Sequence, residues 1–478
     1  MTDLDYDVIV IGAGSTGENV ADRAIKGGLT AVIVESELVG GECSYWACMP
    51  SKALLRPGSA LEGARSVSGA REAITGNLNI PAVFKRRDAF VAHWNDSGQA
   101  KWLDHATIHL IRGHARLTGE RAVVVTDKAG VQTKLKARHA VAVCTGSQPA
   151  FPDIPGLAES RPWTNHEAVS ARMVPPRLAI LGGGVVACEM ATAWKQLGSG
   201  EITIIQRGAR LIPKYEPFAG ELLQASFERK GISVLTETIV ERVDRQPDGM
   251  ASLLLSGGKR LFAEEVLVAT GRAPRTQDIG LESVGLKPGT WLEVDDSMRV
   301  KALSGGWLYA AGDVNHQALL THMGKYQARV CGDVIAARAK GIPESSSPAP
   351  WTKYSATADK WAVPQVIFSD PEVAAVGLTE AEAKALGMKV RVVDYDLGQI
   401  AGAALYADGY QGHARMVIDL DRGVMVGMTL FGPSVGELIH AATVAIVGAV
   451  PISRLWHAVP AYPTISELWL RLLENYGL

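Results

Sequence analysis

Residues 6–35 read YDVIVIGAGSTGENVADRAIKGGLTAVIVE. The stretch begins with a short apolar run rich in β-branched residues, Tyr6–Ile11, which favours a strand. A glycine-rich turn, Gly12–Gly17, leads into a helical pattern that ends at Lys26. The next apolar run, Thr30–Val34, predicts a second strand. Strand, turn, helix and strand within about 30 residues form one βαβ unit.

The three glycines of the turn meet three separate physical demands. Gly12 permits the tight turn, Gly14 lets the backbone approach a pyrophosphate, and Gly17 lets the helix pack closely on the strand. The N-terminus of the helix offers free N–H groups and the positive end of its dipole to a phosphate. Glu35 follows Gly17 at nearly the ~20-residue spacing expected of a carboxylate that holds a ribose hydroxyl. The ordered set predicts a dinucleotide site better than it fits a purely structural turn.

The same pattern returns near the middle of the chain. Leu178–Leu181 predicts a strand, residues 182–187 read GGGVVA, and Cys188–Leu197 has a helical pattern. Glu201–Ile205 predicts the next strand. We therefore expect a second nucleotide-binding domain.

The second unit departs from the first at two positions that contact the nucleotide. Ala187 stands at the third glycine position, and Gln206 stands where the first unit has Glu35. Arg207 and Arg210 follow closely. A ribose 2′-hydroxyl favours a carboxylate, whereas a 2′-phosphate repels a carboxylate and favours arginine. The second site therefore favours NADPH over NADH; the alternative is that Arg207 is a solvated surface residue, the commoner position for arginine.

Two cysteines follow the first βαβ unit. Residues 41–52 read GECSYWACMPSK, with Cys43 and Cys48 separated by four residues. This spacing can fit one helical turn with both sulfurs on one side, where a dithiol can open and close without a large backbone movement. Zinc would need two further Cys or His ligands at short spacing, and none is nearby, so we expect no metal site. A plain pair of buried cysteines is the other alternative, and it is less favoured beside a nucleotide turn.

The whole-chain composition argues against several classes of function. The 478 residues are 47% apolar and 21% charged with a formal net charge of −2, so neither nucleic acid nor an anionic membrane is indicated as a partner. The acidic N-terminus, MTDLDYD, is unlike a secretory signal, and no apolar run is long enough to span a membrane. Five cysteines are too few for a secreted disulfide framework. We therefore expect a cytoplasmic protein.

The length predicts more than one domain. Residues 341–350 read GIPESSSPAP, a breaker-rich stretch that is typical of a domain boundary. Strand-like and helical segments follow it, which favours an α+β domain. The strand-like segments are Gln365–Ser369, Ala414–Leu420 and Val424–Phe431, and the helical ones are Thr379–Leu386 and Ser434–Val447.

Several further motifs, together with these features, resemble the class I flavoprotein disulfide reductases, which include dihydrolipoamide dehydrogenase, glutathione reductase and mercuric reductase. The resemblance covers nearly the whole chain. Its motifs are GGECSYWACMPSK at 40–52, CTGS at 144–147, ATGRAP at 269–274, AGDV at 311–314, LLTH at 319–322, FSDPEV at 368–373 and VGLT at 376–379.

The resemblance implies an α/β fold with two Rossmann-like dinucleotide-binding domains, one for FAD and one for NAD(P)H, and a C-terminal α+β dimerisation domain. We expect the first part of the FAD-binding domain at 1–150, the NAD(P)H-binding domain at 151–275, a central FAD-binding part at 276–350 and the interface domain at 351–478. A homodimer is also implied, because the C-terminal segment of this family reaches the flavin of the partner subunit.

The same resemblance implies roles for individual residues. Hydride passes from the nicotinamide to the flavin, and from the flavin to a disulfide. Cys48 matches the cysteine that touches the flavin as a thiolate, and Cys43 matches the thiol that attacks the substrate. Lys52 is expected to pair with Glu189 near the flavin N5, with a surface lysine as the alternative, and Asp313 is expected to hold the ribityl chain.

The residues expected to bind the two cofactors come from these motifs. For FAD they are Gly12, Gly14, Ser15, Thr16, Gly17, Glu35, Gly41, Glu42, Lys52, Ala115, Thr145, Gly146, Asp313, Leu320, Thr321 and His322. For NAD(P)H they are Gly182, Gly184, Val185, Val186, Gln206, Arg207, Gly271 and Arg272. Because a thiolate and not a thiol is the nucleophile, the site must also lower the pKa of a cysteine.

The C-terminal segment departs from the family. Members have a catalytic histidine in a His-Pro-Thr segment, whereas residues 461–467 read AYPTISE here, with Tyr462 at the histidine position and Glu467 at the position of its orienting acid. Histidine suits thiol proton transfer because its pKa lies near neutrality, while a phenol is a poor base at pH 7 but a usable hydrogen-bond donor. His457 is a weaker substitute because Pro460 intervenes, and we expect it to be a packing or surface residue.

Two more departures bear on the substrate. Mercuric reductase also has tyrosine at this position but adds a C-terminal cysteine pair, and the final residues here, ENYGL, contain none. Residues 44–47, SYWA, are bulkier than the family's usual residues between the cysteines. Trp46 is expected either to crowd the disulfide or to pack in the core.

Four functional hypotheses follow. The first is an FAD-dependent NAD(P)H oxidoreductase with a redox-active Cys43–Cys48 disulfide that reduces a small acceptor, quinone-like or otherwise non-lipoyl, because electron transfer from flavin needs no thiol base. The second is a low-molecular-weight disulfide reductase or a dihydrolipoamide dehydrogenase-like enzyme, with lipoamide disfavoured by the missing histidine. The third is metal-ion reduction of the mercuric type, which the missing C-terminal cysteines weaken. The fourth is a redox sensor or complex-bound subunit, which no linker or charged tail supports.

Overall fold

The computed structural model describes residues 2–342 and 348–478. The chain divides into two compact units. The first comprises Met1–Met49, Asp88–Gln148 and Arg272–Lys360, and the second comprises Pro50–Arg87, Pro149–Gly271 and Trp361–Leu478. Within the predicted boundary at 341–350, residues 343–347 lie outside the described residues.

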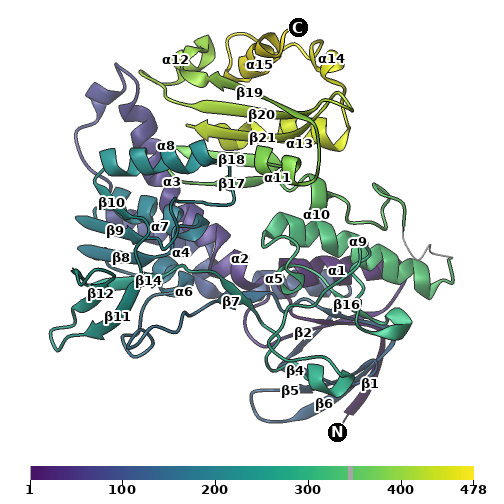
Figure 1. Cartoon of the computed structure of the whole chain (residues 1–478). Helices are drawn as coiled ribbons and strands as arrows, with labels where there is room; N and C mark the ends of the chain where they lie inside the picture. Colours follow the sequence, from purple (N-terminus) through teal and green to yellow (C-terminus); the bar gives the residue numbers. More distant parts are fainter. Residues whose placement is uncertain (1, 343–347) are drawn as a thin grey trace. The chain divides into compact units, whose positions relative to one another are not determined.

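The first unit is built on a seven-stranded sheet in the order β3-β2-β1-β6-β5-β4, with β16 paired to β6 (Figure 1). The strands β3, β2, β1, β6 and β16 run parallel, while β5 and β4 continue from β6 as antiparallel strands. The strands are β1 (Thr2–Ile11), β2 (Ala31–Glu35), β3 (His109–Arg112), β4 (His114–Gly119), β5 (Ala122–Thr126), β6 (Gln132–Val143) and β16 (Leu308–Ala310). The first predicted βαβ unit is confirmed by β1, α1 (Ser15–Lys26) and β2.

Two helices pack together on this sheet. Small residues let α1 and α9 (Thr321–Ala339) approach closely, since a Cβ on Gly332 would collide with Arg23. Arg23 also pairs with Asp333 at 2.5 Å. The core between helices and sheet is apolar, with Val8, Val20 and Ala328 fully buried. The other helices with residues in this unit are α2 (Gly41–Tyr45), the first turn of α3 (Cys48–Arg65), the end of α4 (Ile80–Phe90), α5 (Ser97–His105) and most of α10 (Ala358–Trp361).

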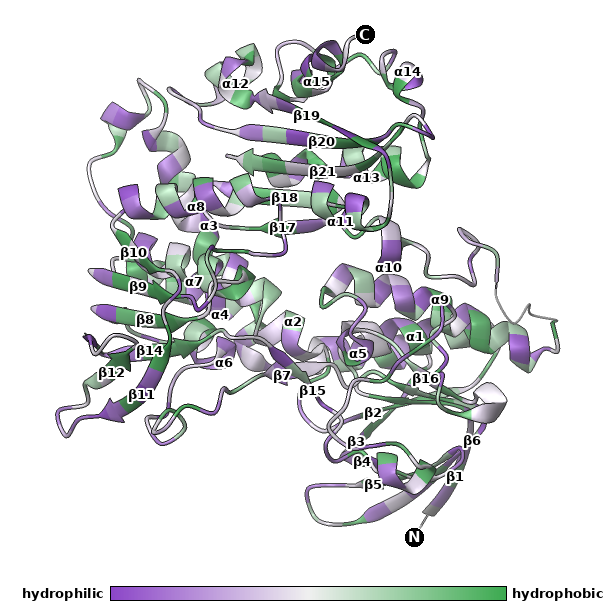
Figure 2. Cartoon of the chain, in the orientation of Figure 1, coloured by the Kyte–Doolittle hydropathy of each residue, from purple (hydrophilic) through white to green (hydrophobic). Residues whose placement is uncertain are grey.

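The second unit contains the second predicted nucleotide-binding sheet. Its four parallel strands have the order β10-β9-β8-β14, and a three-stranded antiparallel sheet β11-β12-β13 accompanies them. Figure 2 shows β8, β9 and β14 as hydrophobic over most of their length, in keeping with their burial. The elements are α6 (Asn165–Ser170), β8 (Arg177–Leu181), α7 (Val185–Gln196), β9 (Glu201–Ile205), α8 (Pro217–Arg229), β10 (Ile232–Leu235), β11 (Val240–Arg245), β12 (Ala251–Leu255), β13 (Arg260–Ala263) and β14 (Glu265–Val268). The helix predicted from Cys188 begins earlier, at Val185, because Gly184 already serves as its N-cap.

The C-terminal part of the second unit has a five-stranded antiparallel sheet in the order β17-β18-β21-β20-β19. The helix predicted at Thr379–Leu386 is present as α11, and Thr379 and Glu382 form a capping box at its start. The helix predicted over Ser434–Val447 is shorter, because Ser434 has a left-handed φ of 58° and a 3₁₀ turn precedes α13. The elements are β17 (Gln365–Ile367), β18 (Glu372–Gly377), α11 (Glu380–Ala385), β19 (Val390–Asp396), α12 (Ala401–Tyr406), β20 (His413–Asp419), β21 (Val424–Gly432), α13 (Ile439–Val447), α14 (Ile452–Leu455) and α15 (Leu468–Tyr476).

These elements confirm the predicted fold class: two Rossmann-like α/β domains and a C-terminal α+β domain. Each parallel sheet places its first strand beside the second, as dinucleotide-binding folds do. Across residues 2–342 and 348–478, none of the helices combines the length and the apolar character needed to cross a membrane.

Candidate functional site

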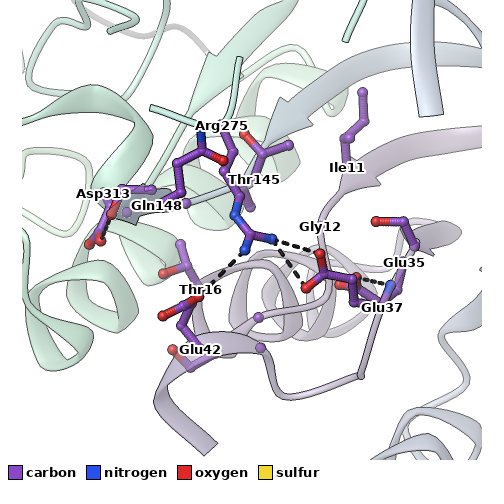
Figure 3. A pocket seen from close by; sticks show the side chains of 18 of the residues that line it. Ile11, Gly12, Thr16, Glu35, Glu37, Glu42, Thr145, Gln148, Arg275 and Asp313 are labelled. Atoms are coloured by element: carbon purple, nitrogen blue, oxygen red, sulfur yellow. Dashed lines mark hydrogen bonds and ion pairs between the residues drawn. The ribbon is translucent and has the colours of Figure 1, made fainter. Parts of the chain in front are cut away.

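A cavity of about 420 Å³ lies in the first unit, where β1, β2, β6 and β16 end (Figure 3). Ligands of open parallel sheets bind at this carboxyl edge, where the strand order reverses. Most residues predicted to bind FAD line it. They are Gly12, Gly14, Ser15, Thr16, Glu35, Gly41, Glu42, Ala115, Thr145, Gly146, Asp313, Leu320 and Thr321, and the predicted catalytic residue Cys43 lines the cavity as well. Gly17, Lys52 and His322 are not among the lining residues.

The glycine-rich turn has the geometry that its three glycines predict. Gly12 has φ +101°, and a Cβ there would lie 2.5 Å from the carbonyl oxygen of Cys144. A Cβ on Gly17 would collide with the Gly12 carbonyl, so Gly17 keeps the helix against the strand. A Cβ on Gly14 would have the Gly41 Cα as its nearest neighbour, at 4.0 Å, so the backbone of Gly14 is open to the cavity.

Two helix N-termini open into this cavity. Gly14 is the N-cap of α1 and Leu320 is the N-cap of α9, and neither has a side-chain capping bond. Thr16 lies against Gly324, so the first turns of the two helices are in contact. Uncapped N–H groups and two positive dipole ends make this edge a binding site for an anion.

Glu35 ends β2 and lines the same cavity. Its carboxylate accepts hydrogen bonds from the backbone N–H groups of Ala13 and Glu37, each at 2.7 Å. Burial raises the pKa of Glu35, and these two bonds oppose the rise. The carboxylate is thus held in place beside the phosphate turn, as its predicted ribose contact requires.

The two cysteines do not share one helical turn, so that part of the prediction is wrong. Cys43 lies in α2, and Cys48 is the first residue of α3. The helix is broken at Trp46, whose φ of −132° is outside the helical region, and the Trp46 ring contacts Trp94 with centroids 5.8 Å apart. The sulfurs are still close enough for a hydrogen bond between the two side chains. The break at Trp46 therefore places the two thiols on two successive helices.

The two thiols have different electrostatic surroundings. The pKa of Cys43 is raised, first because its thiol is hydrogen-bonded to Cys48 and second because it is buried. Cys48 lies at the N-terminus of α3, whose dipole favours a negative charge, and its sulfur is 3.2 Å from the Thr321 hydroxyl. Cys48 is therefore the better placed of the two to carry a thiolate.

Asp313 belongs to a hydrogen-bond chain at the cavity wall. The Ser147 hydroxyl donates to the Asp313 carboxylate at 2.6 Å, and the Arg272 guanidinium donates to the Ser147 hydroxyl at 2.9 Å. Burial raises the pKa of Asp313, while Ser147 and Arg272 oppose the rise. Arg272, which the sequence assigned to NAD(P)H, contacts Ser147 and lies 3.5 Å from Glu42 in the first unit.

Several residues of the cavity were not found by sequence reasoning. They include Glu37, Gln148, Arg275, Gln277 and Asp278. A signal existed for Arg275, because it directly follows the ATGRAP motif at 269–274. Glu37 had none, since its place depends on the loop after β2 and on the distant partner Arg275, 3.2 Å away.

The second glycine-rich turn lies in the second unit and repeats the first. Gly182 has φ +105°, and a Cβ there would collide with the carbonyl oxygen of Ala269. Gly184 is the uncapped N-cap of α7, where an added Cβ would meet nothing within 4 Å, and Ala187 is fully buried. Val185 and Val186 begin α7, and Gly271 ends the second unit's middle segment with φ +143°. The turn can therefore accept a second dinucleotide.

Of the polar residues that follow β9, Gln206 and Arg210 form hydrogen bonds with other described residues, whereas Arg207 does not. Gln206 donates to the Arg210 carbonyl at 3.3 Å, and Arg210 donates to the Pro213 carbonyl at 3.0 Å. Arg207 is exposed, and no hydrogen bond or ion pair links it to any other residue that the structure describes. Its guanidinium is free to meet a phosphate.

The predicted pairing of Lys52 with Glu189 is present in the second unit, at 2.6 Å. Glu189 is 5% exposed and also accepts the Phe368 backbone N–H at 3.1 Å. The Lys52 ammonium lies 4.8 Å from the centre of the Phe368 ring. The pair is thus a buried carboxylate neutralised by a lysine that keeps some contact with solvent.

Replacing Lys52 with methionine is expected to lower the free energy of unfolding by about 2 kcal/mol, because Glu189 would keep a buried, unpaired charge. The Lys52 side chain is 35% exposed, which makes the loss smaller than for a fully buried pair. Denaturant unfolding checks it. Lys26→Met, which removes an exposed pair with Asp22, is the matched control and should cost below about 0.5 kcal/mol. Equal losses in the two variants would contradict the prediction.

The C-terminal residues predicted to act in catalysis differ in their exposure to solvent. Tyr462 is 75% exposed, and its hydroxyl has no hydrogen-bond partner within the described chain. Glu467 is 6% exposed; one carboxylate oxygen accepts from Arg471 at 2.5 Å, and the other is buried with no partner among the described residues. His457 is exposed, as expected. Tyr462 is therefore exposed in the single chain, whereas Glu467 is buried.

Comparison with known proteins identifies the family. The family model described as pyridine nucleotide-disulphide oxidoreductase matches residues 6–341, and its dimerisation domain matches residues 363–472. A mercuric reductase of Acidithiobacillus ferrooxidans is 32% identical over 97% of this chain and 81% of its own length. A dihydrolipoyl dehydrogenase of Thermus scotoductus is 31% identical over 97% of this chain and 95% of its own.

A solved structure supports the same fold. The Cu(II) complex of the HOCl-induced flavoprotein disulfide reductase RclA from Escherichia coli matches with a TM-score of 0.83 and 21% identity, covering 98% of this chain and 99% of that one. The cavity fits FAD on its own evidence: open glycine contacts, two helix N-termini and an anchored carboxylate at the end of β2. The domain boundaries and the roles of single residues stay predictions. The chain belongs to the pyridine nucleotide-disulphide oxidoreductase family, and it is an FAD-containing, NAD(P)H-dependent oxidoreductase.

Proposed function

We propose that this enzyme passes electrons from NAD(P)H to a small non-lipoyl acceptor, with a quinone as the leading candidate. FAD, when bound, supplies the two-electron exchange between the nicotinamide and the acceptor or the cysteine pair. The observation that carries the proposal is Tyr462 at the position of the family's histidine, since a phenol is a poor base for thiol chemistry at neutral pH. A quinone does not depend on that base.

Different residues of the cavity are then proposed to bind different parts of the cofactor. The N-termini of α1 and α9 receive the phosphates, Glu35 holds the ribose, and Asp313 holds the ribityl chain. Lys52 and Glu189 form a charge pair whose lysine is proposed to lie near the reacting ring. The second glycine turn, at Gly182 and Gly184, receives the nicotinamide nucleotide.

A low-molecular-weight disulfide is the second candidate acceptor, because Cys43 lines the cavity with Cys48 beside it. In that reaction the Cys43 thiol gives up its proton and its sulfur attacks one substrate sulfur; the substrate S–S bond breaks, and the first substrate thiolate leaves and takes up a proton. The Cys48 sulfur, on losing its own proton, then attacks the Cys43 sulfur, and the second substrate thiolate leaves and takes up the second proton. The substrate gains two electrons and two protons, and the cysteine pair becomes a disulfide. Tyr462 of a partner subunit would donate a hydrogen bond to the leaving thiol.

Metal-ion reduction is the third candidate. Several relatives are named mercuric reductases, and a solved structure of the same fold is titled as a Cu(II) complex. The sequence contains five cysteines, with none after Cys331, so the C-terminal pair expected of a mercuric enzyme is missing from these residues. We therefore rank this activity below the other two.

We also propose that the active form is a homodimer. The match to the dimerisation domain supports this, and so do the exposed side chains of Tyr462 and Val459, at 75% and 85% exposure. A second copy of the chain would cover them.

The function is tested by steady-state oxidation of NADPH and NADH with four acceptors: a small quinone, lipoamide, glutathione disulfide and Hg(II). We expect efficient quinone reduction and, relative to it, lipoamide turnover lower by at least about a hundredfold. Robust lipoamide turnover would overturn the first proposal, and Hg(II) as the best acceptor would support the third.

Replacing Tyr462 with histidine is expected to raise glutathione disulfide or lipoamide turnover by about 10- to 100-fold, in the range that general acid–base catalysis contributes. Quinone turnover should change less than about threefold. The gain should follow a pH profile with a new ionisation near pH 6–7, as histidine provides. Tyr406→His, which alters another exposed tyrosine, is the control. No gain in Tyr462→His would mean that position 462 does not face the dithiol.

We further infer a preference for NADPH. Replacing Arg207 with glutamate should lower kcat/KM for NADPH relative to NADH by about 10- to 100-fold, because the 2′-phosphate would lose a cation and meet a carboxylate. Arg172→Glu makes the same charge change at another exposed arginine of the second unit and should leave the ratio unaltered. An unchanged ratio in Arg207→Glu would contradict the preference.

A further inference from the structure

Arg275 lies between two glutamates inside the cavity. Its guanidinium is 3.2 Å from both carboxylate oxygens of Glu37 and 3.4 Å from Glu42 (Figure 3). Its backbone N–H donates to the Gly146 carbonyl at 3.1 Å, which fixes the base of the side chain. All four residues line the cavity.

The segment that carries Glu42 packs against the phosphate-binding turn. Gly40 pairs with Gly14 as an isolated β-bridge, and a Cβ on Gly41 would lie 2.8 Å from the Gly14 Cα. Glu42 therefore directly follows Gly40 and Gly41, which contact Gly14 at the N-terminus of α1. Arg275, which contacts Glu42, therefore lines the same cavity as Gly14 at the N-terminus of that helix.

The charges around the cavity are unbalanced. The acidic side chains among its lining residues are Glu35, Glu37, Glu42, Asp278 and Asp313, whereas Arg275 is the single lysine or arginine among the lining residues described. Asp278 is paired with Arg116, which is not a lining residue, and the remaining carboxylates would oppose the binding of a pyrophosphate, which carries negative charge of its own. Arg275 is the side chain placed to offset them.

The bonds that Arg275 makes leave it able to take a further partner. Its three contacts, at 3.2–3.4 Å, are longer than the ~2.7–2.9 Å of strong guanidinium–anion bonds. The Nε–H is buried and has no partner among the described residues. Arg272, by contrast, is engaged with Ser147 at 2.7 and 2.9 Å. A phosphate can therefore be bound by Arg275 without breaking a strong ion pair.

We propose that Arg275 is a positioning residue for FAD, which binds the pyrophosphate through its guanidinium while Glu37 and Glu42 hold that group over the α1 N-terminus. Arg275 would bind FAD in this way whichever acceptor the enzyme reduces.

The test is the rate at which FAD leaves the holoenzyme, followed by the rise in flavin fluorescence on dilution. In Arg275→Met the release rate should rise by about 10- to 100-fold, as expected for the loss of a charge-assisted contact. Arg275→Lys keeps the charge but loses the planar guanidinium, so its FAD release rate should lie between those of the wild type and Arg275→Met. Release from the wild type should quicken as KCl is raised, and release from Arg275→Met should depend less on salt.

The control is Arg138→Met, which removes an arginine bound to Asp7 at 2.6 Å in the same unit but outside the cavity. Its release rate should match the wild type. If Arg275 merely supported the fold, Arg275→Met would lower the unfolding temperature of the protein and keep the wild-type salt dependence of release. That outcome, or a wild-type release rate in Arg275→Met at low salt, would overturn the proposal.

Discussion

Serine at position 43 is expected to lower the turnover of small disulfides by at least about a thousandfold, because the attacking sulfur is removed and an alcohol does not replace it. Quinone turnover should stay within about threefold of the wild type. The residues that hold FAD are untouched by this change, and Cys48 keeps its place at the N-terminus of α3 beside Thr321. Steady-state rates with both acceptors, at equal FAD content, measure the effect.

Ser44→Ala is the matched control for this prediction, because it alters the next residue of α2 and keeps both thiols. It should retain both activities. Loss of quinone turnover in Cys43→Ser would place the dithiol on the quinone path and contradict direct transfer. Retained disulfide turnover would show that Cys43 is not the attacking thiol.

Valine at position 17 is expected to prevent stable FAD binding altogether. A Cβ at Gly17 would collide with the Gly12 carbonyl oxygen, and it would lie 3.2 Å from Val10 at the end of β1. The helix can relieve this only by moving away from the strand, which displaces the N–H groups that receive the phosphates. Gly17→Val should lower the free energy of unfolding by more than about 4 kcal/mol. The purified variant should contain less than about a tenth of the FAD of the wild type.

Gly63→Ala provides the contrasting control. Gly63 lies in α3, and a Cβ there meets nothing within 4 Å. The substitution should leave FAD content unchanged and raise stability by up to about 1 kcal/mol, since alanine is the better helix former. Flavin absorbance of the purified proteins and their thermal unfolding compare the two. A Gly17→Val protein that retains its flavin would refute the proposed role of the turn.

Much of the fold could be read from local pattern. The runs at Tyr6–Ile11 and Leu178–Leu181 lie in strands that are buried over Val8–Ile11 and Leu178–Leu181, and the glycines after them have the positive φ that a tight turn requires. Such features depend on neighbours within a few residues, so the sequence near them is sufficient. The helix at Ser434–Val447 was less well predicted, because the left-handed Ser434 is not signalled by its residue type.

The arrangement of the two thiols shows where local reasoning failed. The spacing of Cys43 and Cys48 was compatible with one helical turn, but the helix breaks at Trp46, which packs against the distant Trp94. Trp46 is therefore engaged in packing beside the dithiol. No pattern within the segment indicated that partner.

The sequence by itself determined the family, the two nucleotide-binding turns and the dithiol, because these are carried by short motifs whose geometry is local. Tertiary structure alone decided which charges meet at the cavity. Thr321 reaches Cys48 across 273 positions, and Arg275 reaches Glu37 across 238. Such pairings depend on how β6, β16 and α9 return to the first sheet, and burial then sets their strength. Arg272 and Arg275, three residues apart in sequence, both lie near Glu42, but Arg272 also binds Ser147 whereas Arg275 also binds Glu37.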